Sequence, residues 1–199
     1  MSNEPALNIK TGDGRFARSK KTKDAIVRAL LKLLRNTPFP TAEQVAKESK
    51  IGLRTVYRQF KDMENIYLSL HEECMHSLGQ IFNSDVDLDR PFNERVCFAI
   101  RERFTIYEKY ETLFIATISN SARLPTLVNQ VAESYQVMRE RFIKIVPEIE
   151  NLSTIKSDLL FTRILFPSWF SLRKVLRHDQ KIIIDELSND LMKYIKSNV

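Results

Sequence analysis

The chain has 199 residues, of which 43% are hydrophobic, and a formal net charge of +6. This composition excludes a disordered protein, because enough apolar side chains are present to form a core. No apolar run approaches the roughly 18 residues that cross a bilayer, the first residues are polar rather than an apolar leader, and two cysteines form no disulfide framework. We therefore expect a cytoplasmic protein that does not bind membranes.

The distribution of charge indicates the kind of partner, and the glycine content indicates the fold class. Residues 1–61 hold 14 Lys or Arg and 5 Asp or Glu, a net charge of +9, whereas residues 62–199 hold 17 and 20, a net charge of −3. A basic end indicates a polyanionic partner for that end, although a solvated basic tail would have the same composition. Only four glycines occur, too few for the turns of a sheet protein, so we expect an all-α fold.

The first 60 residues contain three predicted helices. Residues 1–17 lack a hydrophobic period and are expected to form a flexible basic arm. A helical period begins at Ser19 and ends before Pro38. Thr41, with Gln44 three residues later, fits a capping box and predicts a short helix to about Ser49. A tight turn over 50–52 then leads into another short helix over 53–60.

Longer helices are predicted in the remainder of the chain. Asp62 is expected to cap a helix that runs to about residue 82. Pro167 is expected to kink a helix over 152–177. Short loops are typical of an antiparallel bundle, and about nine helices are expected in all. The other predicted helices lie near 91–109, 111–121, 124–146 and 180–197.

The three N-terminal helices have the order and the tight turn of a helix-turn-helix unit, whose third helix enters a DNA major groove. Val56 and Phe60, four residues apart, supply the apolar stripe that holds such a helix to its core, and Ile51 anchors the turn. The remaining Arg, Gln, Tyr and Thr side chains suit guanine edges, adenine edges and phosphate oxygens.

Residues 22–70 resemble the DNA-binding domain of the TetR family of bacterial regulators. Thr55, Tyr57 and Phe60 match the family pattern Thr-Leu-Tyr-x-His-Phe, and Val56 replaces its Leu. The sequence departs from the family at a turn glycine, a serine cap, a phosphate-binding histidine and a phosphate-binding lysine. Lys61 is expected to compensate for the missing lysine. The residues at the four departures are Lys50, Gly52, Gln59 and Met63.

The resemblance implies a helix-turn-helix DNA-binding domain over 18–66 and an effector-binding and dimerisation domain over 67–199. It implies binding to double-stranded DNA with a palindromic operator. Leu53 is either a core residue or a contact to a thymine methyl group. Arg15, Arg18, Lys20 and Lys21 either lie along the DNA or belong to a solubilising tail. The predicted DNA-binding residues are Thr41, Gly52, Leu53, Arg54, Thr55, Tyr57, Arg58, Gln59 and Lys61.

The resemblance also implies a homodimer formed by the two C-terminal helices. The residues of these helices are too apolar for a fully wet surface, although the core of a monomer would explain them as well. They are Leu159, Leu160, Ile164, Leu165, Phe170, Leu172, Val175, Ile182, Ile183, Ile184, Leu187, Leu191 and Ile195.

A third implication is a repressor that an unidentified small molecule releases from DNA. Aromatic residues in the body suit a hydrophobic or aromatic compound, although aromatics at helical spacing also form ordinary cores. The residues predicted to line this pocket are Phe104, Tyr107, Phe114, Tyr135, Phe142, Phe166 and Trp169.

The sequence gives little indication of an enzyme or of a metal-binding protein. The sequence holds no phosphate loop, nucleophile elbow or HExxH motif, so we expect no enzyme and no cofactor. His71 and Cys74 share one helix face, but two ligands make no zinc site, so no metal is expected. Two alternatives stay open: a helical module that binds a protein through its basic surface, and a DNA-binding dimer without an effector.

Overall fold

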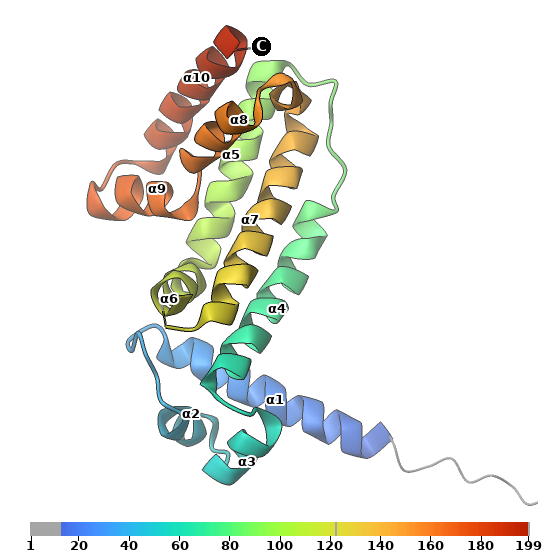
Figure 1. Cartoon of the computed structure of the whole chain (residues 1–199), viewed down its shortest axis with the longest axis vertical. Coiled ribbons are helices and arrows are strands. Elements are labelled where there is room, and N and C mark those ends of the chain that lie inside the picture. The colour runs from blue at the N-terminus through green and yellow to red at the C-terminus, as the bar shows by residue number, and fades with distance from the viewer. Residues whose placement is uncertain (1–12, 122, 199) are drawn as a thin grey trace, which may run out of the picture. The chain divides into compact units, whose positions relative to one another are not determined.

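The computed structural model describes residues 13–121 and 123–198, and this part of the chain is helical with no strand (Figure 1). The predicted all-α fold is confirmed. None of its helices is long and apolar enough to span a bilayer. The helices are α1 (Asp13–Leu33), α2 (Ala42–Ser49), α3 (Leu53–Gln59), α4 (Met63–Phe82), α5 (Phe92–Lys109), α6 (Glu111–Ser121), α7 (Pro125–Ile145), η1 (Pro147–Asn151), α8 (Thr154–Thr162), α9 (Phe166–Phe170), η2 (Ser171–Val175) and α10 (Gln180–Asn198).

The chain divides into two compact units, Met1–Glu72 and Glu73–Val199. The division falls inside α4, so this helix belongs to both units. The sequence placed the boundary in the same helix, between residues 66 and 67.

In the first unit α1 packs against α2 and α3. Its core contains Ile26 and Leu30 from α1, Val45 from α2 and Val56 from α3, all of them buried. α1 begins at Asp13, so the prediction of a flexible arm is wrong for residues 13–17, and residues 1–12 lie outside the described residues. No proline interrupts residues 13–33, and the first turns of a helix tolerate a glycine such as the one at position 14.

In the second unit α5 packs against α7, α9 and α10. α5 and α7 run antiparallel beside each other (Figure 1). The apolar sides of these helices form the core, which includes Ile100, Phe104, Phe142 and Leu191. The bounds of α5, α6, α7 and α10 agree with the predicted ranges to within about one residue.

The predicted continuous helix over 152–177 is wrong. α8 ends at Thr162, and α9 begins at Phe166 with Pro167 in its first turn. A proline inside a helix removes one hydrogen bond and clashes with the carbonyl four residues earlier, whereas the first turn needs no donor at that position. The chain therefore breaks before Pro167 instead of bending at it. Ser168 Oγ donates to the Thr162 carbonyl (2.7 Å) and satisfies one acceptor at the break.

Candidate nucleic-acid interface

A reciprocal pair of hydrogen bonds fixes the start of α2. Thr41 Oγ1 accepts from the Gln44 backbone N–H (3.3 Å), and Gln44 Oε1 accepts from the Thr41 backbone N–H (2.8 Å). The predicted capping box is confirmed. Thr41 is exposed, but its hydroxyl already serves the cap. The same hydroxyl also hydrogen bonds to the Glu43 carboxylate, which lowers the pKa of that carboxyl.

The turn after α2 depends on a left-handed residue. Lys50 has φ 58° and ψ 29°, which is the conformation that a glycine adopts without cost. The Ile51 N–H donates to the Ala46 carbonyl (3.1 Å) and closes the end of α2. An L-residue in this conformation costs roughly 1–2 kcal/mol. This turn brings α3 directly after α2, with Gly52 as its N-cap and no side-chain cap bond.

α3 has seven residues and divides sharply into an anchored side and an exposed side. Val56 is only 1% exposed, and Phe60, at the C-cap, is also buried, so the predicted apolar stripe is confirmed. Arg54, Tyr57 and Arg58 are exposed, Tyr57 by 48% despite its large ring. The exposed side therefore offers two guanidinium groups and a phenol from a helix short enough to fit a groove.

The other predicted residues of α3 are half-buried: Leu53, Thr55 and Gln59. Leu53 lies at the edge between the core side and the exposed side of α3. Gln59 Oε1 accepts from Ser19 Oγ of α1 (3.0 Å). Because its oxygen is used in this way, the Gln59 amide NH₂ is the group that can donate to a phosphate.

The segment after α3 carries further cations. Lys61 is exposed, and Lys23 Nζ of α1 lies 5.7 Å from the centroid of the Phe60 ring. Lys23 therefore lies on the same side as Lys61, a neighbour that sequence spacing does not reveal because the two are on different elements. Both line a polar hollow of about 200 Å³, whose other lining residues are Gln59, Phe60, Asn65, Leu68, Ser69 and Glu72.

Asp62 caps α4 as predicted. Its Oδ1 accepts from the backbone N–H of Asn65 (2.9 Å) and from Asn65 Nδ2 (2.8 Å). These hydrogen bonds lower the pKa of the Asp62 carboxyl, the backbone bond being the larger cause. The carboxylate stays charged at the N-terminal end of α4, where the helix dipole favours it.

The basic residues of α1 are exposed: Arg15, Arg18, Lys20 and Lys21. They belong to a helix rather than to an irregular arm. Arg18 Nε donates to the Gly14 carbonyl (2.9 Å). An ordered helix holds these charges at fixed spacing, which a solubilising tail would not do.

Two solved structures share this arrangement of helices. A proposed fatty acid metabolism regulator from Clostridium perfringens is 17% identical, with a TM-score of 0.60 over 85% of this chain and 97% of that chain. A TetR-family transcriptional regulator from Haemophilus influenzae is 13% identical, with a TM-score of 0.60 over 92% and 98%. The fold is TetR-like. No protein-family model and no curated protein matches the sequence.

In the body of this TetR-like fold, five of the seven predicted pocket residues pack together. The Tyr107 ring lies 5.0 Å from Phe114, 5.4 Å from Phe166, 5.8 Å from Trp169 and 6.2 Å from Phe104, between centroids. Phe142 instead packs edge-on against Phe161, and Tyr135 is half-buried on α7. The structure thus brings most of these residues into one ring cluster, packed ring against ring.

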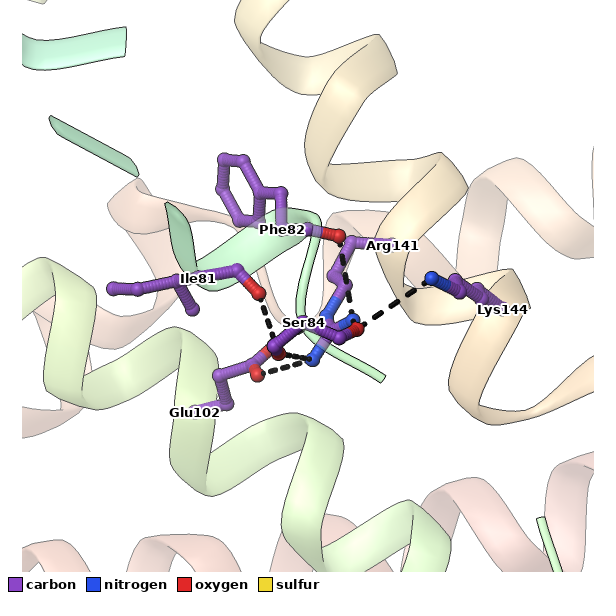
Figure 2. Close-up of polar contacts among 6 residues, drawn as sticks. All are labelled: Ile81, Phe82, Ser84, Glu102, Arg141 and Lys144. Atoms are coloured by element: carbon purple, nitrogen blue, oxygen red, sulfur yellow. Dashed lines mark hydrogen bonds and ion pairs between the residues drawn. The ribbon is translucent and has the colours of Figure 1, made fainter. Parts of the chain in front are cut away.

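A small cavity of about 10 Å³ lies between α5 and α7, and Phe142 is the only predicted pocket residue that lines it. Three arginines are buried in this unit, a feature that sequence patterns do not reveal: Arg95, Arg103 and Arg141. Arg141 donates to the carbonyls of Phe82 (3.3 Å) and Ser84 (2.7 Å) at the end of α4 (Figure 2). α4 is therefore tied to α7 at this point.

The metal alternative gains no support. Over residues 13–121 and 123–198, no group of three or more His, Cys, Asp or Glu side chains is placed to hold an ion. Cys74 is buried, and burial raises the pKa of its thiol to about 12. A thiol that stays protonated is a poor metal ligand.

Proposed function

We propose that this protein is a sequence-specific DNA-binding transcription regulator whose α3 enters the major groove. The observation that carries the proposal is the two-sided character of α3: Arg54, Tyr57 and Arg58 are exposed, while Val56 and Phe60 hold the helix to the core. Arginine pairs with guanine edges, and a tyrosine hydroxyl binds phosphate. Beside these exposed side chains, three further residues of the α3 region would approach the DNA backbone or base methyl groups: Gly52, Leu53 and Thr55.

Phosphate binding in this proposal falls to Thr41, Gln59 and Lys61. Lys23 joins them, since it lines the same polar hollow as Gln59 and Lys61. Lysines and amides that surround a helix in the groove fix its register without reading sequence. Binding should therefore weaken steeply as the salt concentration rises.

A second part of the proposal is a homodimer formed through α8 and α10. These helices lie side by side, since Arg163 binds Asp190 (2.7 Å) and Tyr194 Oη donates to the Lys156 carbonyl (3.3 Å). Ile155 and Leu159 on α8 and Ile182 on α10 are 65%, 50% and 59% exposed, as a partner surface requires. Several residues counted toward the dimer from sequence are instead buried within the chain: Leu160, Ile164, Ile183, Ile184, Leu191 and Ile195.

We further propose repression that a small molecule relieves. The aromatic cluster around Tyr107 supports an apolar ligand for the body. A DNA-binding dimer without an effector is the alternative. The two differ in one measurable respect, because only the first loses DNA affinity when a ligand binds.

The test of DNA binding is selection from random duplexes, followed by fluorescence anisotropy of the selected duplex across a salt series. We expect a palindromic sequence and at least a tenfold loss of affinity for Arg54→Ala and for Tyr57→Ala. Arg101→Ala removes an exposed arginine from α5 in the other unit and should leave the affinity unchanged. Selection of no sequence, with equal binding by all variants, would refute the proposal and favour a protein-binding module.

The dimer is tested separately by sedimentation equilibrium. Leu159→Glu and Ile182→Glu should each shift the protein toward monomer without loss of helical content, because a charge is then placed on an apolar contact. Thr154→Glu adds the same charge at an exposed site at the start of α8 and serves as the control for unfolding. A wild-type protein that stays monomeric would contradict this part of the proposal.

A further inference from the structure

Arg103 of α5 is a cation in an apolar interior. Its side chain is buried, with the residue only 5% exposed. Its guanidinium lies 5.4 Å from the Phe142 ring centroid and 5.9 Å from that of Phe161, and it donates to the Met138 carbonyl. Its side chain also hydrogen bonds to the Tyr107 hydroxyl, so two rings, one carbonyl and one hydroxyl surround the guanidinium.

Arg103 differs from the other two buried arginines of the described chain. Arg95 is paired with Glu148, and Arg141 lies 2.8 Å from Glu102. Over the described residues Arg103 forms no ion pair of its own, and the carboxylate whose charge acts on it, Glu102, is already paired with Arg141. Burial lowers the pKa of Arg103, yet an arginine keeps its proton in proteins. Two buried arginines therefore share the one carboxylate of Glu102, and a buried charge that is only partly balanced is unfavourable unless a partner binds there.

One donor in the same core lacks an acceptor. Trp169 is fully buried, and its Nε1–H has no hydrogen-bond partner in the part of the chain that the structure describes. Its ring lies 5.8 Å from that of Tyr107, which is one helical turn from Arg103 on α5. The Tyr107 hydroxyl is itself used, because it donates to the Ile164 carbonyl (3.1 Å). The interior around Tyr107 therefore contains one buried donor, the Trp169 N–H, that an added acceptor could satisfy.

Arg103 also lines the cavity between α5 and α7. The cavity has about 10 Å³, room for one water molecule at most. Besides Arg103, its lining includes apolar side chains such as Ile106 and Phe142 and the ion pair of Glu102 with Arg141, so the charges around the cavity sum to one positive charge. A ligand larger than water must therefore open the space between these helices, and pairing of the Arg103 charge would favour that opening.

We propose that Arg103 binds the carboxylate of a small organic acid with a hydrophobic tail, which opens the cavity between α5 and α7. A carboxylate accepts hydrogen bonds without donating any, and it matches the fork of a guanidinium. The tail lies against the apolar side chains of the cavity and the neighbouring rings. This inference rests on the proposed effector-regulated function and names the chemical class of the effector.

The test is isothermal titration calorimetry of the full chain in the absence of DNA. The probes are decanoate and 4-phenylbutyrate, each below its micellar concentration, and the matched neutral ligands are decan-1-ol and 4-phenylbutan-1-ol. We expect at least one acid to bind at least tenfold more tightly than its alcohol. Equal binding of acid and alcohol in both pairs, or binding of neither, would overturn the proposal.

Substitutions locate the carboxylate. Arg103→Met, of similar length and without charge, should weaken the acid at least tenfold and leave the alcohol unchanged. Arg139→Met is the matched control, since Arg139 also lies over the Phe161 ring (5.1 Å) but has its own carboxylate in Asp158 (3.7 Å); it should bind the acid as the wild type does. Undiminished acid binding by Arg103→Met would refute the assignment.

A lysine variant gives a second test of the carboxylate contact. Arg103→Lys retains the charge and loses the fork, so its acid affinity should fall between those of the wild type and Arg103→Met, and it serves if the methionine variant does not fold. A lysine variant that binds the acid as tightly as the wild type would refute recognition by the guanidinium fork. The DNA-binding test uses α3 variants and no ligand, so its failure and the failure of acid binding are distinguishable.

Discussion

Arg141 of α7 and Glu102 of α5 form a two-bond ion pair that is almost enclosed by the protein. The bonds are Nη2–Oε1 at 2.8 Å and Nε–Oε2 at 3.1 Å, and the two side chains are 3% and 14% exposed. Arg141 also donates to Ser84 Oγ (2.9 Å), so one side chain joins α5, α7 and the segment after α4 (Figure 2).

Arg141→Ala should lower the free energy of unfolding of the second unit by about 3–5 kcal/mol, because it leaves Glu102 buried without a partner. Urea denaturation followed by the fluorescence of Trp169, the single tryptophan, measures this loss. Arg139→Ala removes a more exposed arginine, whose ion pair is 3.7 Å long, and should cost about 1 kcal/mol or less. Equal losses in the two variants would mean that burial does not set the strength of the Arg141 pair.

Lys50→Gly should stabilise the first unit by about 0.5–1 kcal/mol. Lys50 has a left-handed backbone (φ 58°), and glycine removes its steric cost at the expense of some unfolded-state entropy. Lys47→Gly loses the same charge from the last turn of α2 and should destabilise by about 1 kcal/mol. Hydrogen exchange of the α2 and α3 amides measures both changes in stability. If both glycine variants were less stable than the wild type, the backbone strain at Lys50 would be contradicted.

Thr41 can be tested as a helix cap and as a DNA contact with two different substitutions. Thr41→Ala should cost about 1 kcal/mol of stability, because the bond to the Gln44 N–H is lost. Thr41→Asp keeps a good cap but places a negative charge near the expected phosphates, so it should retain stability and lose at least tenfold in DNA affinity. Asn93→Asp adds the same charge to an exposed site on α5 and should not affect DNA binding. An unchanged affinity for Thr41→Asp would remove Thr41 from the interface.

Glu148 should make the second unit sensitive to acid. The hydrogen bond from the Arg95 side chain is the main cause that lowers the pKa of Glu148 below its usual 4.5. A carboxyl with a lower pKa in the folded state stabilises the fold above the unfolded-state pKa, and this contribution is lost as the pH falls through the folded-state pKa. We therefore measure urea unfolding through Trp169 fluorescence as a function of pH. From about pH 5 downward, the free energy of unfolding of Glu148→Gln should decrease less than that of the wild type. Glu150→Gln, in the same segment, should keep the wild-type slope; a flat wild-type profile would argue against the Arg95–Glu148 contribution.

Local signals in the sequence were sufficient for most helices and for the geometry of α3. The capping box at Thr41, the cap at Asp62 and the stripe of Val56 and Phe60 act over three or four residues, so spacing alone reveals them. The helix break before Pro167 was missed because a proline fits either a kink or a first turn, and packing chooses between them.

The burial of charge and of apolar surface was decided by the tertiary structure. Arginine is normally a surface residue, so nothing in the sequence distinguishes Arg103 and Arg141 from exposed arginines such as Arg101. Similarly, Ile183 is buried in α10 whereas its neighbour Ile182 is exposed. A helical period states which residues share a face, but only the packing of distant helices determines which faces are covered, because burial depends on neighbours far away along the chain.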